Sequence, residues 1–242
     1  MKTDAKTMDW PDSRAFGAST IEERFESLVE TWGQRLVAST SFGIQSSVML
    51  HLISRYTPST PVVFIDTGFL FPETYCYAND LANLLDINLH IYTPKFTAAR
   101  IEALWGKLWE QGDFGEARYA HLTKIEPMNR ALDELGAQVW MSGLRRSQSR
   151  TRRGRDFVEQ QNQILKAYPI LDWTDDQVDQ YCLENDLPVH PLREKGYVTS
   201  GDVHSTKPLT EVSNVEETRF GGQKYECGLH LPAQNTTSWC FG

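Results

Sequence analysis

One stretch near the start of the chain indicates its fold class: Leu36-Val37-Ala38-Ser39-Thr40-Ser41-Phe42-Gly43-Ile44-Gln45-Ser46-Ser47. Its first three residues are apolar and predict a short buried strand. Residues 41–45 predict the exit loop, and residues 46–56 carry apolar side chains at helical spacing. A loop that leads into a helix presents backbone N–H groups, which attract anions. Taken alone, the same loop is equally compatible with an ordinary strand-to-helix turn.

The chain alternates strands and helices on both sides of this stretch. Strands are also predicted at 61–66, 89–92 and 139–142, and helices at 21–32, 71–85, 98–111 and 125–135. This alternation predicts an α/β protein with three layers, in which helices flank a mainly parallel sheet. Such sheets bind ligands at the carboxyl ends of their strands. Because Ser41, Asp66 and Gly143 each follow a strand, we expect them to converge on one edge of the sheet.

The pattern changes toward the end of the chain. One more helix is predicted from Trp173 to about Asn185. Residues 187–242 are rich in Gly, Pro and His and contain too few apolar residues to form a core of their own. We therefore expect a loop-rich tail that folds over the site. Residues 1–242 would then form a single domain with a nucleotide-binding core at about 21–186.

The composition excludes several classes of protein. The chain has 242 residues, 40% of them hydrophobic and 23% charged, which is typical of a soluble globular protein. Its formal net charge of -8 disfavours nonspecific binding to nucleic acid or membranes. No secretory signal is predicted at the start, and no apolar run is long enough to span a bilayer. The four cysteines are scattered without a CxxC pair, which favours free thiols in a reducing cytoplasm and predicts no metal cluster. Because their number is even, a disulfide stays open as an alternative.

One cysteine has neighbours that suit a reactive thiolate. Cys227 lies in the sequence Lys224-Tyr225-Glu226-Cys227-Gly228-Leu229-His230, with Arg219 a short distance upstream. Cations stabilise the thiolate, which is the nucleophilic form of cysteine. Cys76 and Cys182, in contrast, lie in helical stretches beside tyrosines and are expected to be packed thiols. The residues alone leave open whether Cys227 is a nucleophile or a structural thiol.

A dense cationic segment follows the predicted strand at 139–142. Six arginines fall within residues 145–155. Such a run can be a solvated face or an RNA-binding surface. In an acidic protein, a local cationic loop at the end of a strand favours a small, highly anionic ligand.

These motifs together resemble the phosphoadenylyl-sulfate (PAPS) reductase family. The matching stretches extend from about residue 36 to residue 230: Ser41 to Ser46, Asp66 to Tyr75, Gly143 to Ser149, His190 to Leu192 and Glu226 to His230. The resemblance implies an adenine nucleotide α-hydrolase-like fold and reduction of PAPS to sulfite and adenosine 3',5'-bisphosphate in assimilatory sulfate reduction. It also implies thioredoxin as the reductant, with glutaredoxin as the alternative, and a homodimer.

The residues and the resemblance together define the expected site. Cys227 and His230 are the expected catalytic residues, with Cys227 forming an S-sulfonate. No bound cofactor or metal is expected. The expected substrate-binding residues are Ser41, Gly43, Ser46, Ser47, Asp66, Thr67, Gly68, Glu73, Lys124, Gly143, Arg145, Arg146, Arg152, His204, Arg219 and Lys224.

The chain departs from related enzymes that reduce adenylyl sulfate. In those enzymes an iron–sulfur cluster is held by a Cys-Cys pair and a later CxxC. The corresponding positions here hold Tyr119, Ala120, Asp202 and Ser205. A cluster needs thiolate ligands, so none is expected at this place. Residues 231–242, which include Cys240, extend beyond the resemblance.

Two other functions remain open from the sequence. One is an ATP-dependent adenylyltransferase or thiolating ligase with the same fold. Loops that cleave ATP place an Asp after the Gly-rich turn, where this chain has Gln45-Ser46-Ser47, so this alternative is disfavoured. The other is a noncatalytic nucleotide sensor that uses Cys227 as a redox switch. Pyrophosphate release from ATP tests the first, and sulfite production with thioredoxin tests the second.

Overall fold

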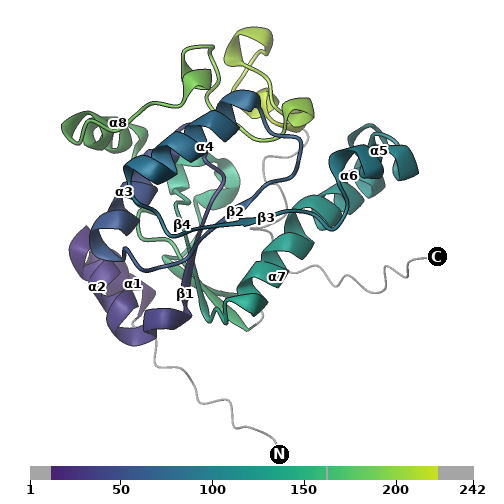
Figure 1. Cartoon of the computed structure of the whole chain (residues 1–242). Helices are drawn as coiled ribbons and strands as arrows, with labels where there is room; N and C mark the ends of the chain where they lie inside the picture. The colour runs from purple at the N-terminus through teal and green to yellow at the C-terminus, as the bar shows by residue number, and fades with distance from the viewer. Residues whose placement is uncertain (1–11, 162, 223–242) are drawn as a thin grey trace, which may run out of the picture.

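The computed structural model describes residues 12–161 and 163–222. The strands in this part of the chain are β1 (Leu36–Thr40), β2 (Val62–Ile65), β3 (Leu89–Tyr92), β4 (Val139–Ser142), β5 (Val158–Gln161) and β6 (Ile164–Ala167). The α-helices are α1 (Ser13–Ala18), α2 (Ile21–Trp32), α3 (Ser46–Tyr56), α4 (Pro72–Leu84), α5 (Ala98–Trp105), α6 (Gly112–Ala120), α7 (Glu126–Glu134) and α8 (Asp175–Glu184) (Figure 1).

The strands form one sheet in the order β3-β2-β1-β4-β6-β5. Strand β1 is central: Ala38 pairs with Val62 of β2 on one side and with Met141 of β4 on the other, both in parallel. Strands β3 and β6 extend the parallel part, and β5 alone is antiparallel. The carboxyl ends of β1, β2 and β4 therefore lie at the same edge of the sheet, as the sequence predicts.

Helices cover both faces of the sheet, which gives three layers (Figure 1). Side chains alternate between the faces along β1, because successive residues of a strand point in opposite directions. Leu36 and Ala38 join the larger core under α2, α3 and α4. Val37 joins a smaller core on the opposite face, where Met128 and other residues of α7 pack against the sheet. This architecture confirms the expected α/β class with a mainly parallel sheet.

Local sequence determines where several helices begin. The Thr20 hydroxyl accepts a hydrogen bond from the backbone N–H of Glu23, and the Glu23 side chain accepts one from the backbone N–H of Thr20. This capping box starts α2 at the predicted place. Helix α3 has the predicted bounds, and Pro72 lies at the first position of α4, where its missing N–H has no helical partner to lose.

The prediction of one helix over residues 98–111 is wrong for its second half. Helix α5 stops at Trp105, and Gly106 follows with a φ of +69°, a left-handed conformation that ends a helix. Gly112, with a φ of +65°, is the first residue of α6, a helix that was not predicted. A π-helical stretch, His121–Ile125, then joins α6 to α7.

Helix α1 and the hairpin formed by β5 and β6 were not predicted. Strand β5 reads Val158-Glu159-Gln160-Gln161 and has neither a continuous apolar run nor a clear alternation. It lies at the edge of the sheet, where pairing with β6 through the backbone suffices. Its strand conformation therefore depends on a tertiary partner and not on local pattern.

Residues 187–222 form loops and short 3-10 turns, as expected for this part of the tail. In Figure 1 this yellow-green segment lies beside the end of α4 that begins at Pro72. Phe71 packs against Leu192 and Tyr197 there. Leu70 and Asp202 form an isolated antiparallel bridge, so the segment meets the exit of β2. In the described ranges, no helix is long and apolar enough to cross a membrane.

Candidate active site

The exit loop of β1 brings the first predicted residues to the edge of the sheet. The side chain of Thr40 accepts a hydrogen bond from the backbone N–H of Phe42 at 3.0 Å, and Phe42 itself is buried with a φ of +46°. This turn leaves Ser41 exposed and Gly43 half-buried in front of α3. Ser47 is instead buried at the second position of α3, where its hydroxyl lies 3.6 Å from the Cys182 thiol.

The exit loop of β2 is held by the carboxylate of Asp66. One oxygen of Asp66 accepts hydrogen bonds from the backbone N–H of Gly68 at 2.8 Å and from the hydroxyl of Tyr75 at 2.6 Å. Burial, together with this hydrogen bond, raises the pKa of the Tyr75 hydroxyl. Gly68 has a φ of +79°, and a Cβ there would lie 3.2 Å from the Cβ of Ala98. Asp66 therefore fixes the shape of the turn that follows β2.

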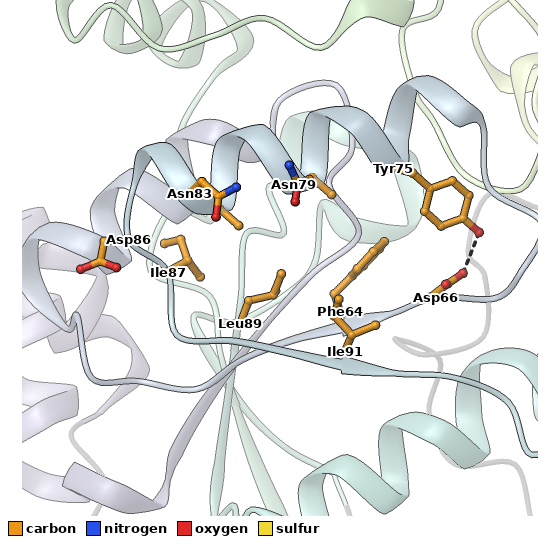
Figure 2. Close-up of a pocket in the computed structure, with 11 residues that line it drawn as sticks. Phe64, Asp66, Tyr75, Asn79, Asn83, Asp86, Ile87, Leu89 and Ile91 are labelled. Atoms are coloured by element: carbon orange, nitrogen blue, oxygen red, sulfur yellow. Dashed lines mark hydrogen bonds between the residues drawn. The ribbon is translucent and has the colours of Figure 1, made fainter.

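A groove of about 290 Å³ runs from Asp66 along α4 (Figure 2). Apolar side chains from β2 and β3, among them Phe64 and Leu89, line it on one side. Tyr75 and Asn79 of α4 line it on the other side. Asp66 is the single predicted site residue that lines this groove, so most of the predicted site lies elsewhere on the edge of the sheet.

The exit of β4 requires glycine at position 143. A Cβ on Gly143 would lie 3.0 Å from the Cβ of Met49, a residue of α3. The absence of a side chain allows the exit of β4 to approach α3 closely. The chain then continues into Arg145, which brings the cationic segment next to the β1 exit loop.

Arg145 is almost completely buried, with 1% of its surface exposed. Its guanidinium forms an ion pair with Asp175 at 2.8 Å and donates hydrogen bonds to the side chains of Gln45 and Ser147. Arg145 thus ties the β1 exit loop to the start of α8. A buried, multiply bonded arginine is a rigid positive group at this edge.

Two other predicted arginines hold the cationic segment together. The Arg146 guanidinium donates to the carbonyl oxygen of Arg155 at 2.8 and 3.1 Å and lies over the ring of Phe157. Arg152 donates to the side chain of Gln148. These contacts make the segment an ordered loop with its own internal hydrogen bonds. Their part in substrate binding stays a prediction.

A buried ion pair joins three segments of the site. The Lys124 ammonium lies 2.5 Å from one carboxylate oxygen of Asp202, and the Thr67 hydroxyl donates to the other at 2.5 Å. Burial by itself raises the pKa of the Asp202 carboxyl, but attraction to Lys124 and the two hydrogen bonds outweigh it and lower the pKa below its ordinary range. The pair links the β2 exit loop, the π-helical stretch and the tail.

His204 lies inside a cluster of aromatic rings. Its ring stacks on Trp109 at 3.9 Å between centroids, and it meets Phe69 and Tyr119 edge to face. Burial lowers the pKa of His204 to about 4; the Asp202 carboxylate opposes this shift, and the nearby cations Lys124 and Arg219 add to it. His204 is therefore neutral at pH 7, and neither ring nitrogen has a hydrogen-bond partner in the described part of the chain.

The start of α4, which includes Glu73, is contacted by His190 of the tail. Glu73 pairs with Lys195 at 2.5 Å, and this hydrogen bond lowers the pKa of its carboxyl. The Nδ1 atom of His190 accepts from the backbone N–H of Leu192, so its Nε2 donates to the Thr74 hydroxyl at 3.2 Å. Burial lowers the pKa of His190 to about 4. His190 thus anchors the tail to α4 as a neutral ring.

The predicted residues that the structure describes lie on the exit loops of β1, β2 and β4, at the starts of α3 and α4, on the π-helical stretch and in the tail, and their roles in binding stay predictions. Cys227, His230 and Lys224 lie outside the described residues, as does Cys240. The expectation that Cys76 is a packed thiol is wrong, because Cys76 is exposed on α4. Within residues 12–161 and 163–222, no group of three or more His, Cys, Asp or Glu residues could hold a metal ion.

Sequence reasoning missed three residues that the structure places at the site. Gln45 accepts from Arg145, Asp175 pairs with the same guanidinium, and Asp202 pairs with Lys124. Asp202 was noted only as a position where related enzymes have a cysteine. That difference draws attention to position 202 but does not identify Lys124 as its partner, and Gln45 and Asp175 carry no sequence signal for their contact with Arg145.

The mainly parallel sheet with helices on both faces is that of an adenine nucleotide α-hydrolase-like protein, as comparison with solved structures shows. FMN adenylyltransferase from Candida glabrata shares the fold, with a TM-score of 0.60, 15% identity, and coverage of 83% of this chain and 65% of that one. The family model for the phosphoadenosine phosphosulfate reductase domain matches residues 35–208. The chain belongs to this family of oxidoreductases.

Individual relatives show how close the similarity is. The chain is 47% identical over 217 residues to a phosphoadenosine 5'-phosphosulfate reductase from Alkalilimnicola ehrlichii, covering 90% of this chain and 89% of the relative. It is 50% identical over 192 residues to a phosphoadenosine 5'-phosphosulfate reductase from Xylella fastidiosa, covering 79% of this chain and 81% of the relative. The phosphoadenylyl-sulfate reductase of Candida auris, solved as a phosphate complex, has a TM-score of 0.71 and 32% identity, covering 81% of this chain and 94% of that one.

Proposed function

We propose that this enzyme reduces PAPS to sulfite and adenosine 3',5'-bisphosphate, with thioredoxin as the electron donor. The observation that carries the proposal is the family membership together with the buried cations at the strand-exit edge. Lys124, Arg145 and Arg219 are each at most 8% exposed, and each belongs to a different segment around that edge. Buried cations in a water-poor site bind anionic groups more strongly than exposed ones do.

The reaction begins with the Cys227 thiolate. It attacks the sulfur of the sulfuryl group, the bond from that sulfur to the phosphate oxygen breaks, and adenosine 3',5'-bisphosphate leaves as a phosphate anion. Cys227 then carries an S-sulfonate. Cations at the edge offset the repulsion between the thiolate and the anionic substrate and stabilise the charge of the leaving phosphate.

Thioredoxin completes the reaction. One of its thiolates attacks the Cys227 sulfur and releases sulfite, which leaves a mixed disulfide between the two proteins. The second thioredoxin thiol attacks the thioredoxin sulfur of that disulfide and frees the Cys227 thiol. The two electrons that reduce the sulfuryl sulfur thus come from the dithiol, which becomes a disulfide. A homodimer is part of the proposal, and glutaredoxin is the alternative reductant.

We further propose that the enzyme works without an iron–sulfur cluster. Two of the positions that hold cluster cysteines in the related enzymes are Tyr119 and Asp202. Both are buried, Tyr119 against His204 and Asp202 against Lys124. Burial and the Asp202 charge raise the pKa of the Tyr119 hydroxyl, so it stays neutral. A neutral phenol and a paired carboxylate are poor substitutes for the thiolates that a cluster needs.

We propose that PAPS is strongly preferred over adenylyl sulfate. A guanidinium binds a phosphate in bidentate fashion, and one charge-assisted hydrogen bond contributes roughly 1.5–3 kcal/mol. Losing one or two such bonds with the 3'-phosphate would lower kcat/KM by about one to four powers of ten at 1.4 kcal/mol per decade. Arg150 and Arg152 are the leading candidates for this contact.

The test is a sulfite assay with purified protein, reduced thioredoxin, and either PAPS or adenylyl sulfate. We expect sulfite from PAPS, an S-sulfonate on the Cys227 peptide when the reductant is left out, and no adduct in Cys227→Ser. Cys240→Ser serves as the matched control and should still form the adduct. Full activity of Cys227→Ser would refute the mechanism, and stoichiometric iron in the active protein would refute the proposal that no cluster is present. Release of pyrophosphate from ATP and magnesium would instead support an adenylyltransferase.

A further inference from the structure

A serine hydroxyl at the edge of the sheet is buried without a hydrogen-bond partner. Ser200 is 7% exposed, and its Oγ atom has no partner within the described ranges. A buried hydroxyl without a partner costs folding free energy, and native structures contain few of them. When such a group lies at a binding site, a bound ligand can supply its partner.

The Ser200 hydroxyl faces the exit loop of β1. A Cβ built on Gly43 would lie 3.7 Å from the Oγ of Ser200 and 3.5 Å from the Oγ of Ser41. The two hydroxyls therefore flank Gly43, one from its own loop and one from the tail. Glycine keeps the space between them open, in front of the N-terminus of α3, where backbone N–H groups favour an anion.

Arg219 supplies a buried cation beside Ser200. Its Nη1 atom donates to the carbonyl oxygen of Ser200 at 2.8 Å, and its Nε atom is buried without a partner among residues 12–161 and 163–222. Gly201 permits this arrangement, because a Cβ there would lie 2.5 Å from the Arg219 Nη1 atom. The hydroxyl of Ser200, which faces the β1 exit loop, and the Nε atom of Arg219, which is bonded to the backbone of Ser200 through Nη1, are thus both buried without a partner among the described residues.

The tail holds this segment in place independently of any ligand. Asp202 is bound to Lys124 and Thr67, and its backbone carbonyl accepts hydrogen bonds from the hydroxyls of Ser205 and Thr206. Ser200 lies two residues before this anchor. Its hydroxyl is therefore presented by a fixed backbone, and not by a loop that could turn it toward solvent.

We infer that Ser200 is a further substrate-binding residue, whose hydroxyl donates to a tetrahedral oxyanion of the substrate seated over Gly43 beside Arg219. This inference rests on the proposed function, which supplies the anion. A phosphate or sulfuryl oxygen accepts hydrogen bonds from a hydroxyl and a guanidinium at once, so one group would satisfy both buried donors. The 5'-phosphate, the 3'-phosphate and the sulfuryl group share this chemistry.

The experiment compares Ser200→Ala with Ser205→Ala. Ser205 is a matched control, because it is also 7% exposed but its hydroxyl already donates to the carbonyl oxygen of Asp202 at 3.3 Å. Dissociation constants for 5'-AMP, adenosine 3',5'-bisphosphate and PAPS are measured by calorimetry, with PAPS tested in a Cys227→Ser background. Thermal midpoints are measured without ligand.

We expect Ser200→Ala to raise the dissociation constant about tenfold, which corresponds to 1.4 kcal/mol, without lowering the ligand-free midpoint. Ser205→Ala should lower the midpoint and leave affinity within about twofold, on the same scale. If Ser200→Ala weakens binding of all three ligands, the Ser200 hydroxyl contacts the 5'-phosphate. If it weakens binding of adenosine 3',5'-bisphosphate and PAPS but not of 5'-AMP, the hydroxyl contacts the 3'-phosphate. If it weakens binding of PAPS alone, the hydroxyl contacts the sulfuryl group. Unchanged affinity for all three, or a lowered midpoint in Ser200→Ala, would overturn the inference. Absence of sulfite production by the wild type would instead refute the proposed function. The dissociation constant for 5'-AMP would still show whether Ser200 contacts the 5'-phosphate.

Discussion

Replacing Asp202 with asparagine should destabilise the enzyme severely. The carboxylate is completely buried and is bound by Lys124 and Thr67, each at 2.5 Å. Asp202→Asn keeps the size of the side chain but leaves the Lys124 ammonium, itself 7% exposed, without a counter-charge. Removing one partner of a buried ion pair costs about 3–5 kcal/mol. For a chain of this length, that corresponds to a fall in Tm of roughly 6–20 °C at 2–4 °C per kcal/mol.

The assay is urea unfolding followed by circular dichroism and by tryptophan fluorescence, with the free energy of unfolding obtained by linear extrapolation. Glu110→Gln is the matched control, because Glu110 pairs with Lys107 at 3.3 Å and both side chains are more than half exposed. An exposed pair contributes about 0–1 kcal/mol. The reasoning about the buried pair is refuted if Asp202→Asn lies within 1 kcal/mol of the wild type, a limit set by the value for an exposed pair.

The same pair predicts how stability depends on pH. Because the folded-state pKa of Asp202 is lowered below its ordinary value of 3.8, its contribution is present above pH 3.8 and is lost as the pH falls through the folded-state pKa. Asp202→Asn should therefore flatten the acid limb of the stability curve. The double variant Lys124→Met/Asp202→Leu should recover most of the lost free energy, because well-packed apolar residues often replace a buried pair without loss.

Three further predictions concern other parts of the site. Gly143→Ala should cost about 1–2 kcal/mol, because its Cβ would press on Met49 at 3.0 Å, and thermal unfolding would measure the loss. Arg145→Met should lower the free energy of unfolding by about 1–2 kcal/mol. The loss is smaller than for a fully buried pair because the side chain of Asp175 is 60% exposed. An unchanged free energy of unfolding in urea would contradict this prediction. His190 has a folded-state pKa of about 4, so stability should fall as the pH drops from 6.5 toward 4. In His190→Asn this slope should decrease by up to about 1.4 kcal/mol per pH unit, as measured by urea unfolding across that range.

The sequence predicted the part of the fold that depends on local pattern. Strand β1 and helix α3 are buried, so their apolar residues recur at the spacing of a strand and a helix, and they were located nearly to the residue. The edge strand β5 was missed because three of its four residues are polar and its pairing with β6 is made by the backbone. Strand β6 was missed although three of its four residues are apolar, because a run of four residues is too short to define a strand by itself. Breaks at Gly106 and Gly112 were missed because glycine within an apolar pattern does not by itself end a helix.

The candidate site divides in the same way. Motif residues such as Ser41, Asp66 and Gly143 could be predicted, because in a parallel sheet every strand exit faces one edge and the order of the motifs places them there. The partners of the buried charges could not be predicted from the sequence. Lys124 and Asp202 are far apart in the chain, and no periodicity relates them. Their contact, like the approach of Ser200 to Gly43, exists because the tail returns across the β2 exit loop, which only tertiary packing determines.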